Sequence, residues 1–178
     1  VRETLYAHWS DGSRQTLLEH TEHVGELSGA LGARIGLSAL CMLIGIFHDF
    51  GKAKEAFQDY LKMEEEAQRA LRGRINHSAG GARWLWEQLP DDRLAAQLMA
   101  LAVCAHHGGL PDCVRPDGRN GLLERLYPQK EIGYEECREN FLAECVSQEQ
   151  VDALLQRASG ELRQFEERLN AACADLRP

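Results

Sequence analysis

A chain of 178 residues, 44% hydrophobic and 27% charged, is long enough for one domain with a substantial core. Its formal net charge of −8 excludes a protein that binds nucleic acid tightly by general electrostatic attraction, because that attraction needs clustered Lys and Arg. The charge does not exclude a protein that meets nucleic acid at a small local site.

Helical periodicity dominates the first fifty residues. Apolar side chains recur at helical spacing from Thr16 to Ile35, which predicts an amphipathic helix. Ser38 is the expected N-cap of a second, strongly apolar helix that ends at Asp49, and Gly51 is its expected stop. The expected inward face of the first helix carries Leu17, His20, Val24, Leu27 and Leu31.

Further helices are expected along the rest of the chain, and alternating strand patterns are almost absent. We therefore predict an all-α fold, a single helical bundle over residues 1–178. The segment from Leu110 to Asn120 is rich in Pro, Gly and Asp and is expected to be a loop. The expected helices are 63–72 (exposed), 78–89, 91 or 92 to 107, and three more after the loop, the last from 148 to about 175 with a charged outer face.

The longest apolar run, from Leu37 to Phe47, is too short to cross a bilayer and predicts a buried helix. The first residues lack the basic, apolar and small-residue pattern of a signal peptide. None of the six cysteines forms a C-x-x-C pair, so reduced thiols are expected. These features predict a cytoplasmic chain with no membrane partner.

The pair His48-Asp49 ends the most apolar predicted helix. A buried Asp is costly unless it is paired or bound to a metal. Imidazole and carboxylate together are the usual ligands of first-row transition metals. The pair therefore indicates a metal site. The alternative is a histidine that interacts with the helix dipole and an Asp at the solvent edge.

Other histidines lie at similar places. His106 and His107 end another apolar helix before two glycines, His20 lies on the expected inward face of the first helix, and His77 stands where a helix is expected to begin. Taken singly, His20 and His77 are more simply core or capping residues, and the alternative for His106-His107 is interaction with a helix dipole. The weaker candidates are His8 and His23, the latter expected in solvent.

Three other features carry less weight. The run from Gly45 to Lys52 is one residue too long for a P-loop, and Ala53 stands where Ser or Thr is needed, so an ATPase motor is excluded. Trp84 and Trp86 are expected to pack rather than to stack on bases. Arg69, Arg72 and Arg74 form a basic cluster, interpreted as a solvated face rather than a path for a nucleic-acid backbone.

The order of these residues resembles the HD superfamily of metal phosphohydrolases. His48-Asp49-Phe50-Gly51-Lys52 matches its HDxGK segment, and His77 with His106-His107-Gly108 narrows the match. Together with Tyr6-Ala7-His8 and Leu17-x-x-His20, these motifs look like the HD nuclease domain of type I CRISPR systems, found as a separate protein or fused ahead of a helicase. The resemblance runs from Tyr6 to Leu110.

The resemblance implies a single HD domain with two metal ions held between helices. His20, His48 and Asp49 would hold the first ion. Asp49 would bridge to the second ion, whose other ligands would be His77, His106 and His107. Asp49 and Lys52 are the expected catalytic residues, with Lys52 steadying the phosphate or its transition-state charge.

The family's first metal also takes a downstream Asp. Asp152 and Asp175 lie in the right general region, but neither has the expected neighbours.

The function implied is hydrolysis of phosphodiester bonds in single-stranded DNA during CRISPR interference, an antiviral defence. A CRISPR-associated helicase and an RNA-guided surveillance complex are the implied partners. Histidine-rich ligation favours two divalent ions of iron, manganese, cobalt or nickel over magnesium. Two alternatives remain: an HD phosphohydrolase that acts on nucleotides or cyclic nucleotides, and a degenerate metal-binding module that docks a partner.

Overall fold

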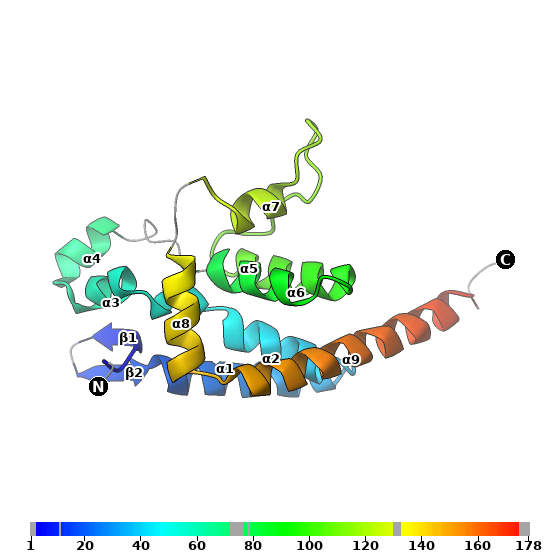
Figure 1. The fold of residues 1–178 in the computed structure, drawn as a ribbon, viewed down its shortest axis with the longest axis horizontal. Helices are drawn as coiled ribbons and strands as arrows, with labels where there is room; N and C mark the ends of the chain where they lie inside the picture. The colour runs from blue at the N-terminus through cyan, green and yellow to red at the C-terminus, as the bar shows by residue number, and fades with distance from the viewer. Residues whose placement is uncertain (1–2, 11, 72–76, 78, 130–132, 175–178) are drawn as a thin grey trace.

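The computed structural model describes residues 3–174 except 11, 72–76, 78 and 130–132. The described residues form nine α-helices, one 3-10 helix and one antiparallel hairpin (Figure 1). This content confirms the all-α prediction, to which the hairpin is a small addition. The elements are β1 (Tyr6–Ser10), β2 (Ser13–Thr16), α1 (Leu17–Ala33), α2 (Ser38–Phe47), the 3-10 helix (Phe50–Ala53), α3 (Glu55–Lys62), α4 (Glu65–Leu71), α5 (Ala79–Gln88), α6 (Arg93–Ala105), α7 (Gly121–Leu126), α8 (Tyr134–Glu144) and α9 (Gln148–Ala174).

Helix α2 is the centre of the domain. It packs against α1 and α9 in one layer, while α5 and α6 cover it from the other side (Figure 1). Its apolar side chains Leu40, Leu43 and Phe47 are buried, and the ring of Trp84 stacks on Phe47 with centroids 4.4 Å apart. The prediction that Trp84 is a packing residue is therefore confirmed. The hairpin, α3 and α4 lie together at the opposite end from the last turn of α9 (Figure 1).

Helices α1 and α2 approach closely because glycines line their contact. Gly25, Gly29 and Gly32 are the buried residues along α1, together with Leu17 and Thr21. A Cβ atom added to Gly45 of α2 would lie 2.6 Å from a backbone oxygen of α1, so a side chain does not fit there. The contact is made largely between main chains.

This contact corrects the predicted inward face of α1. Leu27 and Leu31 are 63% and 57% exposed and lie on the outer surface. Large side chains would hold the two helices apart, whereas the glycine face lets them touch. His20 is partly buried as expected, and His23 is exposed as expected.

The ends of α2 also differ from the prediction. Ser38 is the first helical residue rather than the N-cap, and the capping acceptor comes from α9: Glu161 Oε2 accepts hydrogen bonds from the backbone N–H of Ala39 (2.7 Å) and Leu40 (3.3 Å). The helix ends at Phe47 rather than at Asp49. Gly51 lies in the 3-10 helix that follows and does not stop α2.

Other predicted elements agree with the structure. Helix α4 has no buried residue, as expected of an exposed helix, and Arg69 on it pairs with Glu65 at 2.7 Å. The loop predicted from Leu110 to Asn120 contains no helix or strand. Three helices follow it, as expected. Arg72, Arg74 and the predicted helix start at residue 78 lie outside the described residues. No helix in the described part of the chain has the length and apolar character needed to cross a membrane.

The hairpin is fastened to the segment that follows α2. Gln58 of α3 accepts a hydrogen bond from Tyr6 N (2.9 Å) and donates to Tyr6 O (3.0 Å) and Lys52 O (2.7 Å). Because Gln58 is buried, these bonds are shielded from water and hold β1 in place. The sequence analysis did not predict this element.

Candidate metal centre

The site lies where α2 and α6 end. His48 is the C-cap residue of α2, and His106 is the C-cap residue of α6. Each Nδ1 is 2.7 Å from the carbonyl oxygen three residues earlier, on Gly45 and Val103 respectively, and donates its hydrogen to it. In the neutral ring this leaves the lone pair on Nε2, the atom that faces Asp49.

One oxygen of the buried Asp49 carboxylate is crowded. Oδ2 lies 2.9 Å from His20 Nε2, 3.0 Å from His48 Nε2 and 2.8 Å from Lys52 Nζ. The two imidazole Nε2 atoms are themselves 3.1 Å apart. Since His48 uses its Nδ1 hydrogen on Gly45, a neutral His48 directs a lone pair at the carboxylate. A cation between these atoms relieves that repulsion, so the donors fit a metal ion.

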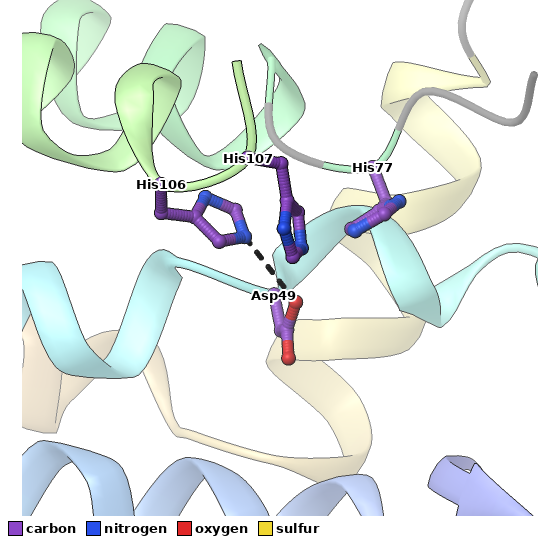
Figure 2. Close-up of side chains that lie close together, drawn as sticks. All are labelled: Asp49, His77, His106 and His107. Carbon is purple, nitrogen blue, oxygen red and sulfur yellow. Dashed lines mark ion pairs between the residues drawn. The ribbon is translucent and has the colours of Figure 1, made fainter. Parts of the chain in front are cut away.

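The other carboxylate oxygen of Asp49 has no hydrogen-bond partner within the described residues, although it is buried. The Nε2 atom of His106 lies 3.7 Å away, beyond hydrogen-bond distance (Figure 2). An unpartnered buried carboxylate oxygen is costly. A divalent cation among Asp49 and the facing histidines would satisfy it.

The structure gathers the predicted ligand atoms into two groups that share Asp49. In each group, one ligand atom per residue lies within 4.8 Å of all the others. The first group draws His20 from α1, and the second draws His77 from the segment just before α5. The groups are His20, His48 and Asp49, and Asp49, His77, His106 and His107.

Candidates outside the two groups are placed as follows. His8 on β1 is exposed, with its ring centroid 5.1 Å from that of His20. Asp152 is exposed on α9 and accepts a hydrogen bond from Gln148, so it is not part of either group. Asp175 lies outside the described residues.

Main-chain contact sets the position of His77. The N–H of Gly51 donates to the carbonyl oxygen of His77 at 3.1 Å. A Cβ atom on Gly51 would collide with the backbone of His77, so only glycine allows the two segments to touch. From the sequence, Gly51 is expected to stop a helix. Its role in letting the two segments touch depends on contact with His77, which the distance between them along the chain does not reveal.

The charges of the site favour a cation. Burial by itself raises the pKa of Asp49, but the facing imidazoles of His106, His20 and His48 hold that pKa well below its usual range when their Nε2 atoms carry a hydrogen toward the carboxylate. Burial, followed by the nearby His106, lowers the pKa of His107. The carboxylate is therefore ionised and His107 is neutral at neutral pH, which are the forms that bind a metal. His48 differs: burial lowers its pKa, but the hydrogen bond and charge of Asp49 outweigh burial and raise it, so a metal ion bound there would displace a proton.

Lys52 is buried beside the carboxylate. Its ammonium lies 2.8 Å from Asp49 Oδ2 and donates to the carbonyl oxygen of Ala7 at 3.2 Å. The motif predicts this positive charge beside Asp49, and the structure places it there. Ala7 is a second contact of the ammonium that the sequence analysis did not identify.

A helical bundle whose His-Asp pair directly follows a central helix, and whose buried Asp meets further histidines from three other segments, is an HD-type domain. The comparisons agree. Residues 1–175 match the model of the family described as "Cas3, HD domain", and the chain belongs to that family.

A relative from Haloferax volcanii, "CRISPR-associated nuclease/helicase Cas3", is 35% identical over 113 residues. The match covers 59% of this chain and 11% of the relative, so this chain spans a small part of that protein's length. The family suggested by the motifs is thus confirmed.

Proposed function

We propose that this domain is a metal-dependent nuclease that hydrolyses phosphodiester bonds of single-stranded DNA in CRISPR interference, an antiviral defence. The observation that carries the proposal is the arrangement of Asp49, whose two oxygens face two different groups of histidines. A shared carboxylate is the ligand that a two-metal phosphodiesterase needs. Family membership supports the same class of reaction.

The ligand sets follow from the two groups. His20, His48 and Asp49 would hold one ion, and Asp49 with the three remaining histidines His77, His106 and His107 would hold the other. This histidine-rich set favours iron, manganese, cobalt or nickel over magnesium. When bound, such ions polarise the phosphate and lower the pKa of a coordinated water, which supplies the nucleophile.

The chain's own residues prepare the site for a phosphodiester. The two carbonyl bonds from His48 and His106 fix the ring orientations before any ligand arrives. Lys52 contributes a positive charge held by Asp49 and Ala7, where it stabilises negative charge that develops on the phosphate. Asp49 and Lys52 are therefore the proposed catalytic residues.

Partners are needed to bring DNA to this acidic domain. With a net charge of −8, the chain offers little general attraction for a polyanion. The Haloferax volcanii relative is described as a nuclease and a helicase, and the matched part of this chain covers 11% of it. A helicase and an RNA-guided surveillance complex are the partners we propose for delivery of the strand.

One assay tests the proposal against its alternatives. The metal-free protein is reconstituted with Mn, Fe, Co, Ni or Mg and given single-stranded DNA, duplex DNA, nucleotides and cyclic nucleotides in parallel. We expect cleavage of single-stranded DNA with the first four metals and slower cleavage with Mg. Turnover of nucleotides alone would support a nucleotide phosphohydrolase, and bound metal without turnover would support a docking module. Asp152→Ala is the matched control, because this aspartate is exposed on α9 outside the site.

A further inference from the structure

A hollow of about 580 Å³ lies beside the metal centre, between the hairpin and helices α3 and α4. Lys52, His77 and His107 line it on the side of the site. Three aromatic residues, Trp9, Phe57 and Tyr60, line it elsewhere. Its size is within the usual range for small-ligand sites. The hollow therefore adjoins the place where the proposed function puts the scissile phosphate.

The wall formed by β1 is fixed relative to the metal ligands. Lys52 contacts both Asp49 and the carbonyl oxygen of Ala7, and Gln58 ties the preceding residue of the strand to the main chain of Lys52. Trp9 follows Ala7 by two residues on this strand. Its indole packs edge-to-face with the ring of Tyr6, with centroids 4.8 Å apart, and this contact positions it beside the site.

The aromatic side chains around the hollow are suited to a nucleobase. Trp9 and Tyr60 are half-buried, so each keeps part of its ring accessible. The exposed guanidinium of Arg14, which does not line the hollow, stacks over one face of the Trp9 ring, 4.0 Å from its centroid, so a base would stack on the face that Arg14 leaves open. Bases of single strands stack on aromatic side chains without strong sequence preference, and arginine pairs with phosphate.

We propose that this hollow is a subsite for one nucleobase of single-stranded DNA next to the phosphodiester that is cut. Trp9 is the stacking residue, Tyr60 forms a second wall, and Arg14 pairs with a neighbouring phosphate. The subsite rests on the proposed function for its substrate. It accounts for how an acidic domain positions a strand locally after delivery.

The test measures binding of oligothymidylate and of an abasic oligomer of the same length, at low salt and without metal, so that no cleavage occurs. We expect Trp9→Ala to raise the Kd for oligothymidylate about 10-fold, the loss typical of one stacked base. Wild-type protein should bind the abasic oligomer as weakly as the variant binds oligothymidylate. Trp86→Ala is the matched control, because Trp86 is also half-buried beside an arginine, with Arg93 5.0 Å from its ring, and lies outside the hollow.

Fluorescence gives a second readout that does not depend on an alanine variant folding. Oligothymidylate should quench tryptophan emission of the wild type, and the quenching should be lost in Trp9→Phe and retained in Trp86→Phe. Equal binding of both oligomers by the wild type, or quenching unchanged in Trp9→Phe, would overturn the subsite. Cleavage is then assayed with metal on the same preparations. Absence of cleavage would refute the proposed function and leave the binding result standing.

Discussion

The two groups of ligands that share Asp49 differ in how far the protein itself satisfies them. In the group with His20 and His48, one carboxylate oxygen already lies within 3.0 Å of both rings and of Lys52. In the group with His106, the other oxygen lies 3.7 Å from His106 Nε2 and has no hydrogen-bond partner among the described residues. The first carboxylate oxygen thus has partners in Lys52 and His20, whereas the second oxygen has none among the described residues without a cation. The comparison predicts different consequences when each part is changed.

The largest effect is expected from Asp49→Ala, because this residue belongs to both groups. Nuclease activity should be abolished and bound metal lost at both positions. Metal analysis and single-stranded DNA cleavage on one preparation test this, with circular dichroism to show that the variant folds. Undiminished cleavage by a folded Asp49→Ala variant, free of contaminating nuclease, would contradict the role of Asp49 as the ligand that both groups share.

Lys52→Ala should separate catalysis from ligation. Its ammonium contacts Asp49 but is not a metal ligand, so metal content should stay near that of the wild type. Turnover should fall by about 10²- to 10³-fold, the range for loss of one electrostatic contact to a developing charge. Parallel loss of metal and activity would show instead that Lys52 serves mainly to hold Asp49 in place.

Single histidine variants sharpen the comparison directly. His20→Ala should weaken metal binding chiefly at the first group, and His106→Ala chiefly at the second, each by at least about 10- to 100-fold. Because hydrogen bonds already organise the first group, His20→Ala should also lower the melting temperature of the metal-free protein more than His106→Ala does. Calorimetric titration with Mn²⁺ and a melting curve for each variant would measure both quantities. Identical losses at both positions would mean that the groups do not bind metal separately.

Metal should also stabilise the fold. At a free concentration about 100 times its Kd, a metal that binds only the folded state adds about 2.7 kcal/mol, which raises the melting temperature of a domain of this size by about 5–10 °C. Addition of Mn²⁺ to the metal-free wild type should produce this shift, and Asp49→Ala should not show it. Differential scanning fluorimetry with and without EDTA is sufficient.

The smallest effect concerns DNA affinity outside the site. With a charge of −8 we expect the isolated domain to bind single-stranded DNA with a Kd no tighter than about 10⁻⁶ M at physiological salt. A salt titration followed by fluorescence anisotropy measures this. Nanomolar affinity under those conditions would show that the domain makes several phosphate contacts outside the two ligand groups.

Periodicity predicted most of the fold, and its errors have physical reasons. The inward face of α1 was assigned from large apolar residues such as Leu27, but the helix packs through Gly25 and Gly29, because contact between main chains favours small residues. The hairpin was missed although the sequence Asp-Gly at positions 11–12 is typical of hairpin turns. In the structure Ser10 pairs with Ser13. Short strands outside a large sheet give too few residues for an alternating pattern to stand out.

Sequence motifs predict the residues of the candidate site better than the contacts that hold those residues in place. Motif order grouped the histidines with Asp49, and the structure brings them together. The carbonyl bonds that orient His48 and His106 follow from where each helix ends. The contact of Lys52 with Ala7 joins residues more than 40 positions apart. Gln58 of α3 fastens β1, a different element, to the main chain of Lys52. Such tertiary contacts leave no trace in local spacing.

Gly51 shows why a complete set of ligands is not the same as a working centre. The peptide of His77 rests against its Cα with no room for even a methyl group. A chain with alanine at this position would retain every histidine, Asp49 and Lys52. Its His77, however, would be pushed out of reach of Asp49. Inspection of a related sequence for metal ligands alone would score such a chain as intact. The residue that distinguishes an active from an inactive relative can therefore be one that never touches the metal, the water or the DNA.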